Sequence, residues 1–90
     1  YGVPSPDGRW YAFVSDHGGR PEVFVRSLVG DDAELQVSLD GGSEPMWSAD
    51  GRELFFRGET PSGARLLAAR LALGADPRVL SRAELFDVQT

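Results

Sequence analysis

This chain of 90 residues carries 14 acidic and 9 basic side chains, a formal charge of −5, and no cysteine. The acidic balance argues against nucleic-acid binding, which needs a clustered basic surface, and the lack of cysteine excludes disulfides and thiolate metal sites. Hydrophobic residues make up 41% of the chain, enough for one small domain, but no apolar run reaches the roughly 20 residues that insert across a bilayer.

One short phrase occurs twice and divides the chain into two similar halves. Ser5-Pro6-Asp7-Gly8-Arg9 returns as Ser48-Ala49-Asp50-Gly51-Arg52, at an offset of 43 residues. The same offset aligns further identical pairs without a gap: Phe13 with Phe56, Leu28 with Leu71, and Ser38 with Ser81. Asp-Gly between two apolar runs indicates a hairpin turn, because glycine adopts positive φ without a Cβ clash. We therefore expect two copies of one hairpin-based unit.

In chain order, the first unit is predicted to hold four short strands separated by polar turns. They are Gly2–Ser5, Trp10–Ser15, Glu22–Leu28 and Leu35–Leu39. Residues 16–20 and 30–32 form the internal turns, and Asp40-Gly41-Gly42 forms the exit turn, because Gly and Asp cluster there.

The second unit is predicted to repeat this order, with one conflict. Its strands are Glu44–Ser48, Glu53–Arg57, Arg65–Leu71 and Arg78–Ser81. The stretch Ala64–Ala72 is rich in Ala, Leu and Arg, so local propensity favours a helix there. The aligned stretch Glu22–Arg26 is typical of a strand, and on that ground we predict a strand.

The apolar runs indicate how these sheets are covered. Trp10–Val14 and Leu54–Phe56 are continuous, which predicts strands covered on both faces. Four antiparallel strands repeating at this period and packed on both faces are typical of a propeller blade. The predicted fold is all-β, a β-propeller fragment of two four-stranded antiparallel blades. Blade one covers residues 1–42, blade two covers 43–86, and residues 87–90 start a following blade or form a tail. Within it, we expect Trp47, Phe13 and Phe56 in the blade core.

Candidate catalytic and metal-binding residues are few. His17 is the only histidine and lies in a turn beside Asp16, and no Gly-x-Ser-x-Gly elbow accompanies it, so no catalytic residue is predicted. Acidic residues gather in two places, Asp31, Asp32 and Glu34, and Asp40 with Glu44. Neither group has the Asp/Asn-and-Gly spacing of a calcium loop, so we interpret both as solvated loops and expect no metal or cofactor.

The repeated turn residues have a structural interpretation. Asp7 and Asp50 are expected to accept hydrogen bonds from the backbone of their own turns, with Gly8 and Gly51 at positive φ. Arg9 and Arg52 mark either a shared ligand surface or, as we prefer, the start of the second strand with the charged head in water.

Two longer stretches carry a family resemblance. Residues 5–16 (SPDGRWYAFVSD) and 47–57 (WSADGRELFFR) resemble the WD-like propeller repeat of the TolB type. The connecting residues 19–26, 36–38 and 40–45 resemble the carboxy-terminal propellers of bacterial serine/threonine protein kinases. Two positions depart from the repeat: Ala49, where Pro6 is typical, and Pro4, where an aromatic such as Trp47 is typical.

The resemblance implies a non-catalytic module that binds or senses a protein or a small ligand. If it belongs to such a kinase, the family places the propeller outside the cytoplasm, in the periplasm or beyond. The alternative is the substrate-gating propeller of a prolyl-oligopeptidase-type serine peptidase, whose catalytic residues lie in a separate domain. Because two blades leave two open apolar faces, we also expect the chain to form a homo-oligomer that completes a ring.

Overall fold

The structure is a computed structural model that describes all residues except 1, 17, 30–32, 61–62, 75 and 88–90. The described residues form eight strands: β1 (Gly2–Pro4), β2 (Trp10–Ser15), β3 (Glu22–Ser27), β4 (Glu34–Gln36), β5 (Ser43–Trp47), β6 (Glu53–Thr60), β7 (Gly63–Ala72) and β8 (Arg78–Asp87). They contain no helix, and so none that could cross a membrane.

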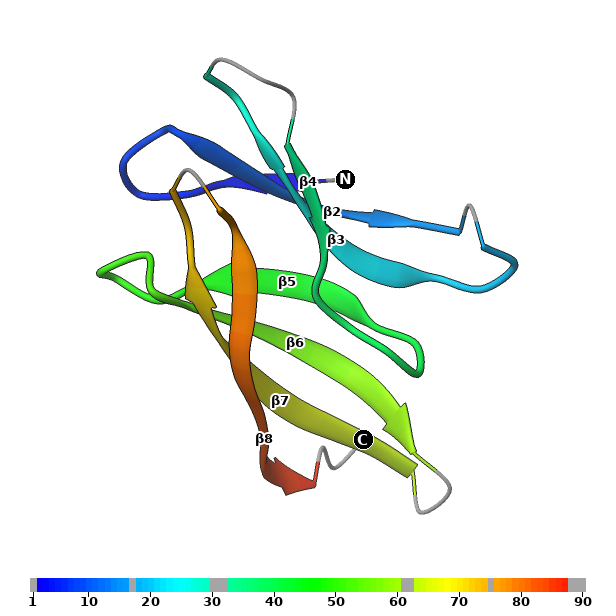
Figure 1. Ribbon diagram of the computed structural model, residues 1–90. Helices are drawn as coiled ribbons and strands as arrows, with labels where there is room; N and C mark the ends of the chain where they lie inside the picture. The colour runs from blue at the N-terminus through cyan, green and yellow to red at the C-terminus, as the bar shows by residue number, and fades with distance from the viewer. Residues whose placement is uncertain (1, 17, 30–32, 61–62, 75, 88–90) are drawn as a thin grey trace.

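The strands form two antiparallel sheets with the same order. Sheet 1 has the order β1-β2-β3-β4 and sheet 2 has the order β5-β6-β7-β8, so each strand pairs with its neighbour in sequence. Figure 1 shows sheet 1 in blue to cyan-green and sheet 2 in green to red. The described strands of each sheet follow one another in sequence order, without a crossover connection. The prediction of two four-stranded antiparallel sheets is confirmed.

The strand prediction for residues 64–72 is also confirmed, against local helix propensity. β7 pairs along its length with β6 on one side and β8 on the other, for example Leu67 opposite Phe56. The helix preference of Ala, Leu and Arg over ordinary strand residues is only roughly a few tenths of a kcal/mol per residue. Hydrogen bonds on both edges of β7 and the burial of Ala69 and Leu71 outweigh that preference.

Several predicted strand boundaries were wrong by three residues or more, and one of them is in β6, which continues to Thr60 instead of ending at Arg57. β4 ends at Gln36 instead of Leu39, because the N–H groups of Val37 and Ser38 both turn to the carbonyl of Val23. β8 continues from Arg78 to Asp87 instead of ending at Ser81, and pairs with β7 through two register shifts. Residue 87 therefore belongs to sheet 2, and 88–90 lie outside the described residues.

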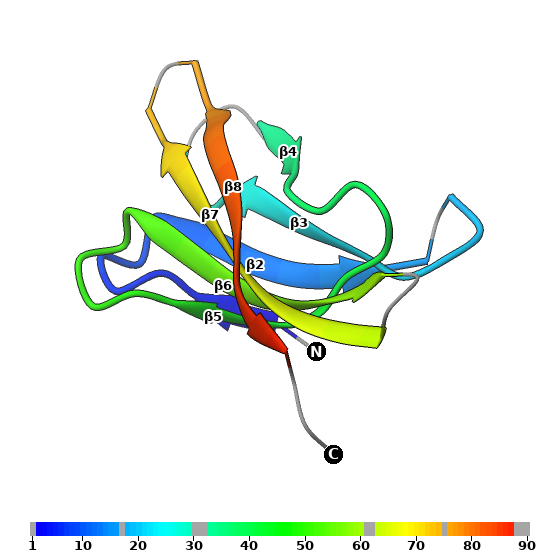
Figure 2. The same cartoon turned by 90° about the horizontal axis from the view of Figure 1, so that it is seen from below.

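The core lies between the two sheets. Its buried members are Trp10, Ala12, Val23, Val25 and Val37 from the first repeat, and Leu54, Phe56, Ala69 and Leu71 from the second. β5 lies against β1 and β2, and Figure 2 shows it beside β1 from below. Sheet 2 therefore covers one face of sheet 1.

Within this chain each sheet is covered on one face only, which agrees with the expectation that two blades leave two open outer faces. Along β2, Trp10 and Ala12 are buried, whereas Tyr11 and Phe13 between and beyond them are only partly buried. Alternation of this kind places successive side chains on opposite faces of the sheet. Each sheet thus has one face in the core and one open face.

Candidate functional site

The two repeated turns have the same geometry. In the first, the Ser5 hydroxyl donates to Asp7 Oδ1 at 2.6 Å and the Arg9 N–H donates to the same oxygen at 3.0 Å. In the second, the corresponding distances to Asp50 Oδ1 are 2.8 Å from Ser48 and 3.0 Å from Arg52. The predicted turn role of both carboxylates is confirmed.

The glycines of these turns behave as predicted. Gly8 and Gly51 both have φ 73°, and each donates its N–H to the serine carbonyl three residues earlier, at 2.9 and 3.0 Å. Ala49 stands where the first turn has Pro6, yet φ and the hydrogen bonds are the same. The hydrogen bonds that each aspartate accepts within its own turn, together with the glycine at positive φ, are therefore sufficient for the turn.

The turn hydrogen bonds also set the charge state of the two carboxyls. They hold the pKa of Asp7 below its usual value, mainly through the Ser5 hydroxyl and then the Arg9 N–H. For Asp50 the order is reversed, with the Arg52 N–H as the main cause of the lowered pKa. Both side chains act as charged acceptors that are occupied by their own turns, which makes them poor candidates for general acids.

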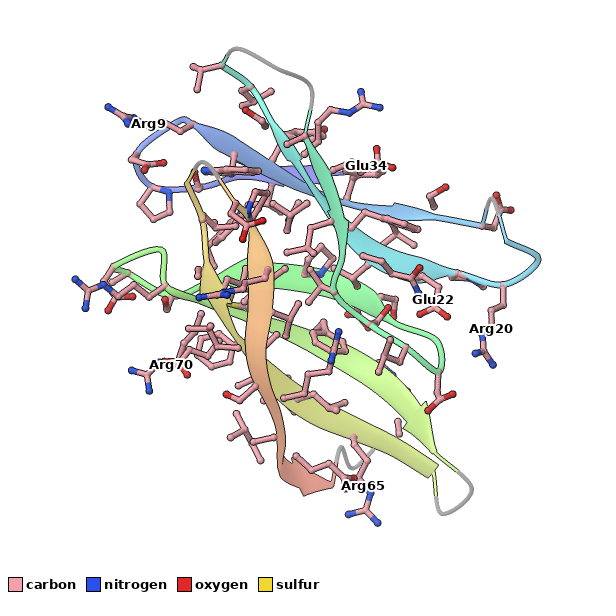
Figure 3. The ribbon with its side chains drawn as sticks, viewed as in Figure 1. Arg9, Arg20, Glu22, Glu34, Arg65 and Arg70 are labelled. Atoms are coloured by element: carbon pink, nitrogen blue, oxygen red, sulfur yellow. The ribbon has the colours of Figure 1, made fainter. Side chains whose placement is uncertain are left out.

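A groove lies between the two turns, at the end of the sheets where β7 ends. Its volume is about 750 Å³, and its walls come from both turns and from the ends of β3 and β7: Ser5, Pro6, Asp7, Arg9, Trp10, Ser27, Val29, Asp50, Gly51, Arg52, Leu71, Leu73 and Gly74. Both Arg9 and Arg52 are exposed, as predicted, and Figure 3 shows Arg9 extending from its turn into solvent. Within the described residues, neither guanidinium has an ion pair or hydrogen bond.

A buried polar cluster joins β3 to the connection between the sheets. Glu22 accepts from the Ser38 hydroxyl at 2.5 Å and from the Gly41 N–H at 3.0 Å, while Ser38 Oγ accepts from the Val23 N–H at 2.7 Å. Arg20 closes the cluster with a 3.0 Å bond to the other Glu22 oxygen; Figure 3 labels both residues. Every buried side-chain polar atom in the described part of the chain has a partner. The cluster therefore holds the connection in place.

Our sequence interpretation missed this cluster. The signal available was the pair of polar stretches at 16–20 and 40–42, which we interpreted only as turns, with Glu22 at the start of the strand that follows the first. Glu22 and Ser38 are 16 residues apart, so no local pattern brings them together.

The three predicted core aromatics have different environments. Phe56 is 2% exposed and lies in the core, as expected. Trp47 is partly buried and packs against the core, consistent with its expected core position, while its indole N–H donates to the Val3 carbonyl at 2.9 Å. Phe13 is also partly buried and lies on the open face of sheet 1, where its ring stacks on Phe24 at 5.7 Å.

The acidic residues singled out in the sequence as candidate metal ligands either lie outside the described residues or form ion pairs with arginine. His17, Asp31 and Asp32 lie outside the described residues. The other singled-out acidic residues form ion pairs, Glu34 with Arg26 at 3.4 Å, Asp40 with Arg20 at 3.5 Å, and Glu44 with Arg57 at 3.8 Å. No group of three potential ligands that could hold a metal occurs in the part of the chain that the structure describes.

Comparison with known proteins gives one informative similarity. No family model matches the chain. A stretch of 52 residues is 38% identical to the uncharacterized peptidase YuxL of Bacillus subtilis (strain 168). The match covers 56% of this chain and 8% of that protein, so the chain spans a small part of the relative's length.

Proposed function

We propose that this chain is a non-catalytic β-propeller segment of two adjacent blades that binds a protein or small ligand. The observation that carries this proposal is the repetition: two sheets with the same strand order and the same Asp-Gly turn, stacked face to face. Stacked four-stranded sheets of this kind build propellers, which bind their ligands at the ends and in the channel of a rigid ring.

The groove between the repeated turns is the proposed ligand site. Arg9 and Arg52 supply donors at its rim, and Trp10, Leu71 and Leu73 supply an apolar wall. Because Arg9 and Arg52 have no ion pair or hydrogen bond within the described residues, while the Asp7 and Asp50 carboxylates that also line the groove each use Oδ1 in their own turn, the groove favours an anionic group attached to an apolar body. The carboxyl terminus of a peptide with an apolar last residue has this chemistry.

The binding proposal is tested by titrating the labelled chain with the tetrapeptide Ala-Ala-Ala-Leu in two forms, with a free and with an amidated carboxyl terminus. We expect NMR shifts of the Trp10 indole and of the turn amides with the free form only. Arg9→Ala/Arg52→Ala is the variant expected to lose them, and Arg70→Ala/Arg78→Ala, at two exposed positions outside the groove, is the control with equal charge. Shifts that are equal for both peptide forms, or absent, would contradict the anionic preference.

The non-catalytic part is tested separately by incubating the chain with peptide p-nitroanilides and p-nitrophenyl esters. We expect no turnover above buffer. Turnover that persists through purification and is lost in a His17→Ala variant would contradict this part and leave the binding result untouched.

A second candidate places the same two blades in the substrate-gating propeller of a serine peptidase. The similarity to the peptidase YuxL supports this candidate over the bacterial signalling kinase or TolB-like protein that the repeat resemblance suggests. In such enzymes the propeller limits access to a separate hydrolase domain.

Sequencing the gene on both sides of these residues distinguishes the candidates. A downstream Gly-x-Ser-x-Gly elbow with Asp and His favours the peptidase, and kinase motifs upstream favour the signalling protein. In the peptidase case, removing these blades from the whole enzyme should raise cleavage of long peptides relative to short ones. An unchanged ratio would contradict gating.

A further inference from the structure

Each sheet has one open face, and the alignment of the two repeats relates each open face to one side of the interface between the sheets. The N-face is the open face of sheet 1, formed by Tyr11, Phe13, Phe24 and Arg26. The C-face is the open face of sheet 2, where Met46, Phe55 and Leu66 lie around the buried Ala68. Met46 is 64% exposed, and the aromatic rings of the N-face are only partly buried.

The N-face is built from the same repeat positions that sheet 2 uses to cover sheet 1. Shifted by 43 residues, Tyr11, Phe13, Phe24 and Arg26 become Leu54, Phe56, Leu67 and Ala69. Three of these are buried core residues, and Leu67 packs against that core. The N-face is therefore the first repeat's copy of a surface that already packs on a blade.

The C-face is built from the repeat positions with which sheet 1 contacts sheet 2. Sheet 1 presents Ala12, Val23 and Val25 to sheet 2, all buried. The same offset turns them into Phe55, Leu66 and Ala68, which lie on the C-face. The molecule thus exposes both halves of its own internal interface, one at each end.

We infer that a second copy of this chain is the occupant of these faces, with the N-face of one copy packed on the C-face of the next. The contact is head-to-tail, so it repeats the stacking of sheet 2 on sheet 1 and leaves another pair of faces free. Two to four copies supply the roughly four to eight blades that close a propeller ring. Packing of two N-faces on each other would not repeat any contact in the structure.

The contact between copies is weaker than the internal one, for two reasons on the N-face. Pro4 stands where Trp47 donates its indole N–H to the Val3 carbonyl, so the equivalent bond to a neighbour's Met46 carbonyl cannot form. Arg26, paired with Glu34 and lying 5.6 Å from the Phe13 ring centre, occupies the place of the buried Ala69. Association is accordingly concentration-dependent.

The test uses one charge substitution on each face of the complete chain. Wild type should sediment at micromolar concentration with a mass well above 9.8 kDa. Phe24→Glu blocks the N-face and Met46→Glu blocks the C-face, and each variant alone should be a monomer. An equimolar mixture should form one-to-one dimers, because the first variant keeps its C-face and the second keeps its N-face.

Monomeric wild type, or a mixture that stays monomeric, overturns the inference. Self-association of either single variant overturns it too, because that result requires like faces to pair. Circular dichroism and thermal melting confirm that each variant is folded; if either is not, Tyr11→Glu and Leu66→Glu address the same faces. The hydrolysis and peptide-binding results of the proposed function do not bear on this outcome.

Discussion

The two repeats are alike in backbone and opposite in environment. Phe13 and Phe56 occupy the same place in the same kind of strand, yet Phe56 is in the core while Phe13 lies on an open face. The difference arises because sheet 2 covers sheet 1 on one side only. A repeated sequence therefore repeats strands and turns, whereas the burial of each side chain depends on which neighbour is present.

A second difference concerns the polar cluster at Glu22 and Ser38. The equivalent positions in the second repeat are Arg65 and Ser81, and Ser81 is exposed. Arg65 pairs with Glu84 of β8 at 3.4 Å. The first repeat uses these positions to hold the connection between sheets, and the second uses them within its own last hairpin.

The largest expected effect tests the two phenylalanines. Phe56→Ala should lower the free energy of unfolding by about 3–5 kcal/mol, because it leaves a cavity in the core. Phe13→Ala should cost clearly less in dilute solution. Urea unfolding followed by tryptophan fluorescence measures both. Equal costs at low concentration would mean that the N-face is covered within a single chain.

The next effect tests the two serines. Ser38→Ala removes the hydroxyl that bonds both Glu22 and the Val23 N–H, so two buried polar groups lose a partner. We expect a loss of about 1–3 kcal/mol. Ser81→Ala, at the equivalent exposed position, should change stability by less than about 0.5 kcal/mol. Similar losses from the two variants would refute the assigned role of the cluster.

The two turns should respond alike, in contrast to the serines. Gly8→Ala and Gly51→Ala should each cost about 1–2 kcal/mol, because a Cβ is strained at φ 73°. Space is not the cause: an added Cβ meets nothing within 4 Å at Gly8, and its nearest neighbour at Gly51 is Pro6 Cδ at 3.5 Å. Gly74→Ala is the control, with open space and no positive φ. Losses at Gly74 as large as at the turns would contradict this explanation.

The smallest effect is the acid response of the turns. Folding lowers the pKa of Asp7 and Asp50. As the pH falls through their usual value of 3.8, the unfolded chain therefore binds more protons than the folded chain, and the stability that the two carboxylates contribute is lost. The urea midpoint of wild type should therefore fall between about pH 5 and about pH 3. Asp7→Asn/Asp50→Asn should fall less over that interval, and an identical fall would show that the turn carboxylates do not contribute.

Local sequence was sufficient for the turns and for the type of most elements. The positive φ of Gly8 and Gly51 and the carboxylate bonds of Asp7 and Asp50 involve residues no more than five positions apart, so their causes are contained in a few adjacent letters. The strand at β7 needed slightly more, the alignment of the two repeats. The strand predicted from the repeat is correct although helix propensity favoured a helix, because pairing of β7 with β6 and β8 decides its conformation.

Only the tertiary structure decided the environment of individual side chains. The length of β8, the partial burial of Trp47 and the cluster around Glu22 depend on partners distant in sequence, 44 residues away in the case of Trp47 and Val3. Likewise, periodicity could not separate the core face from the open face, because both are apolar. Which face is buried is determined by where the second sheet packs, and that is a property of the assembled chain.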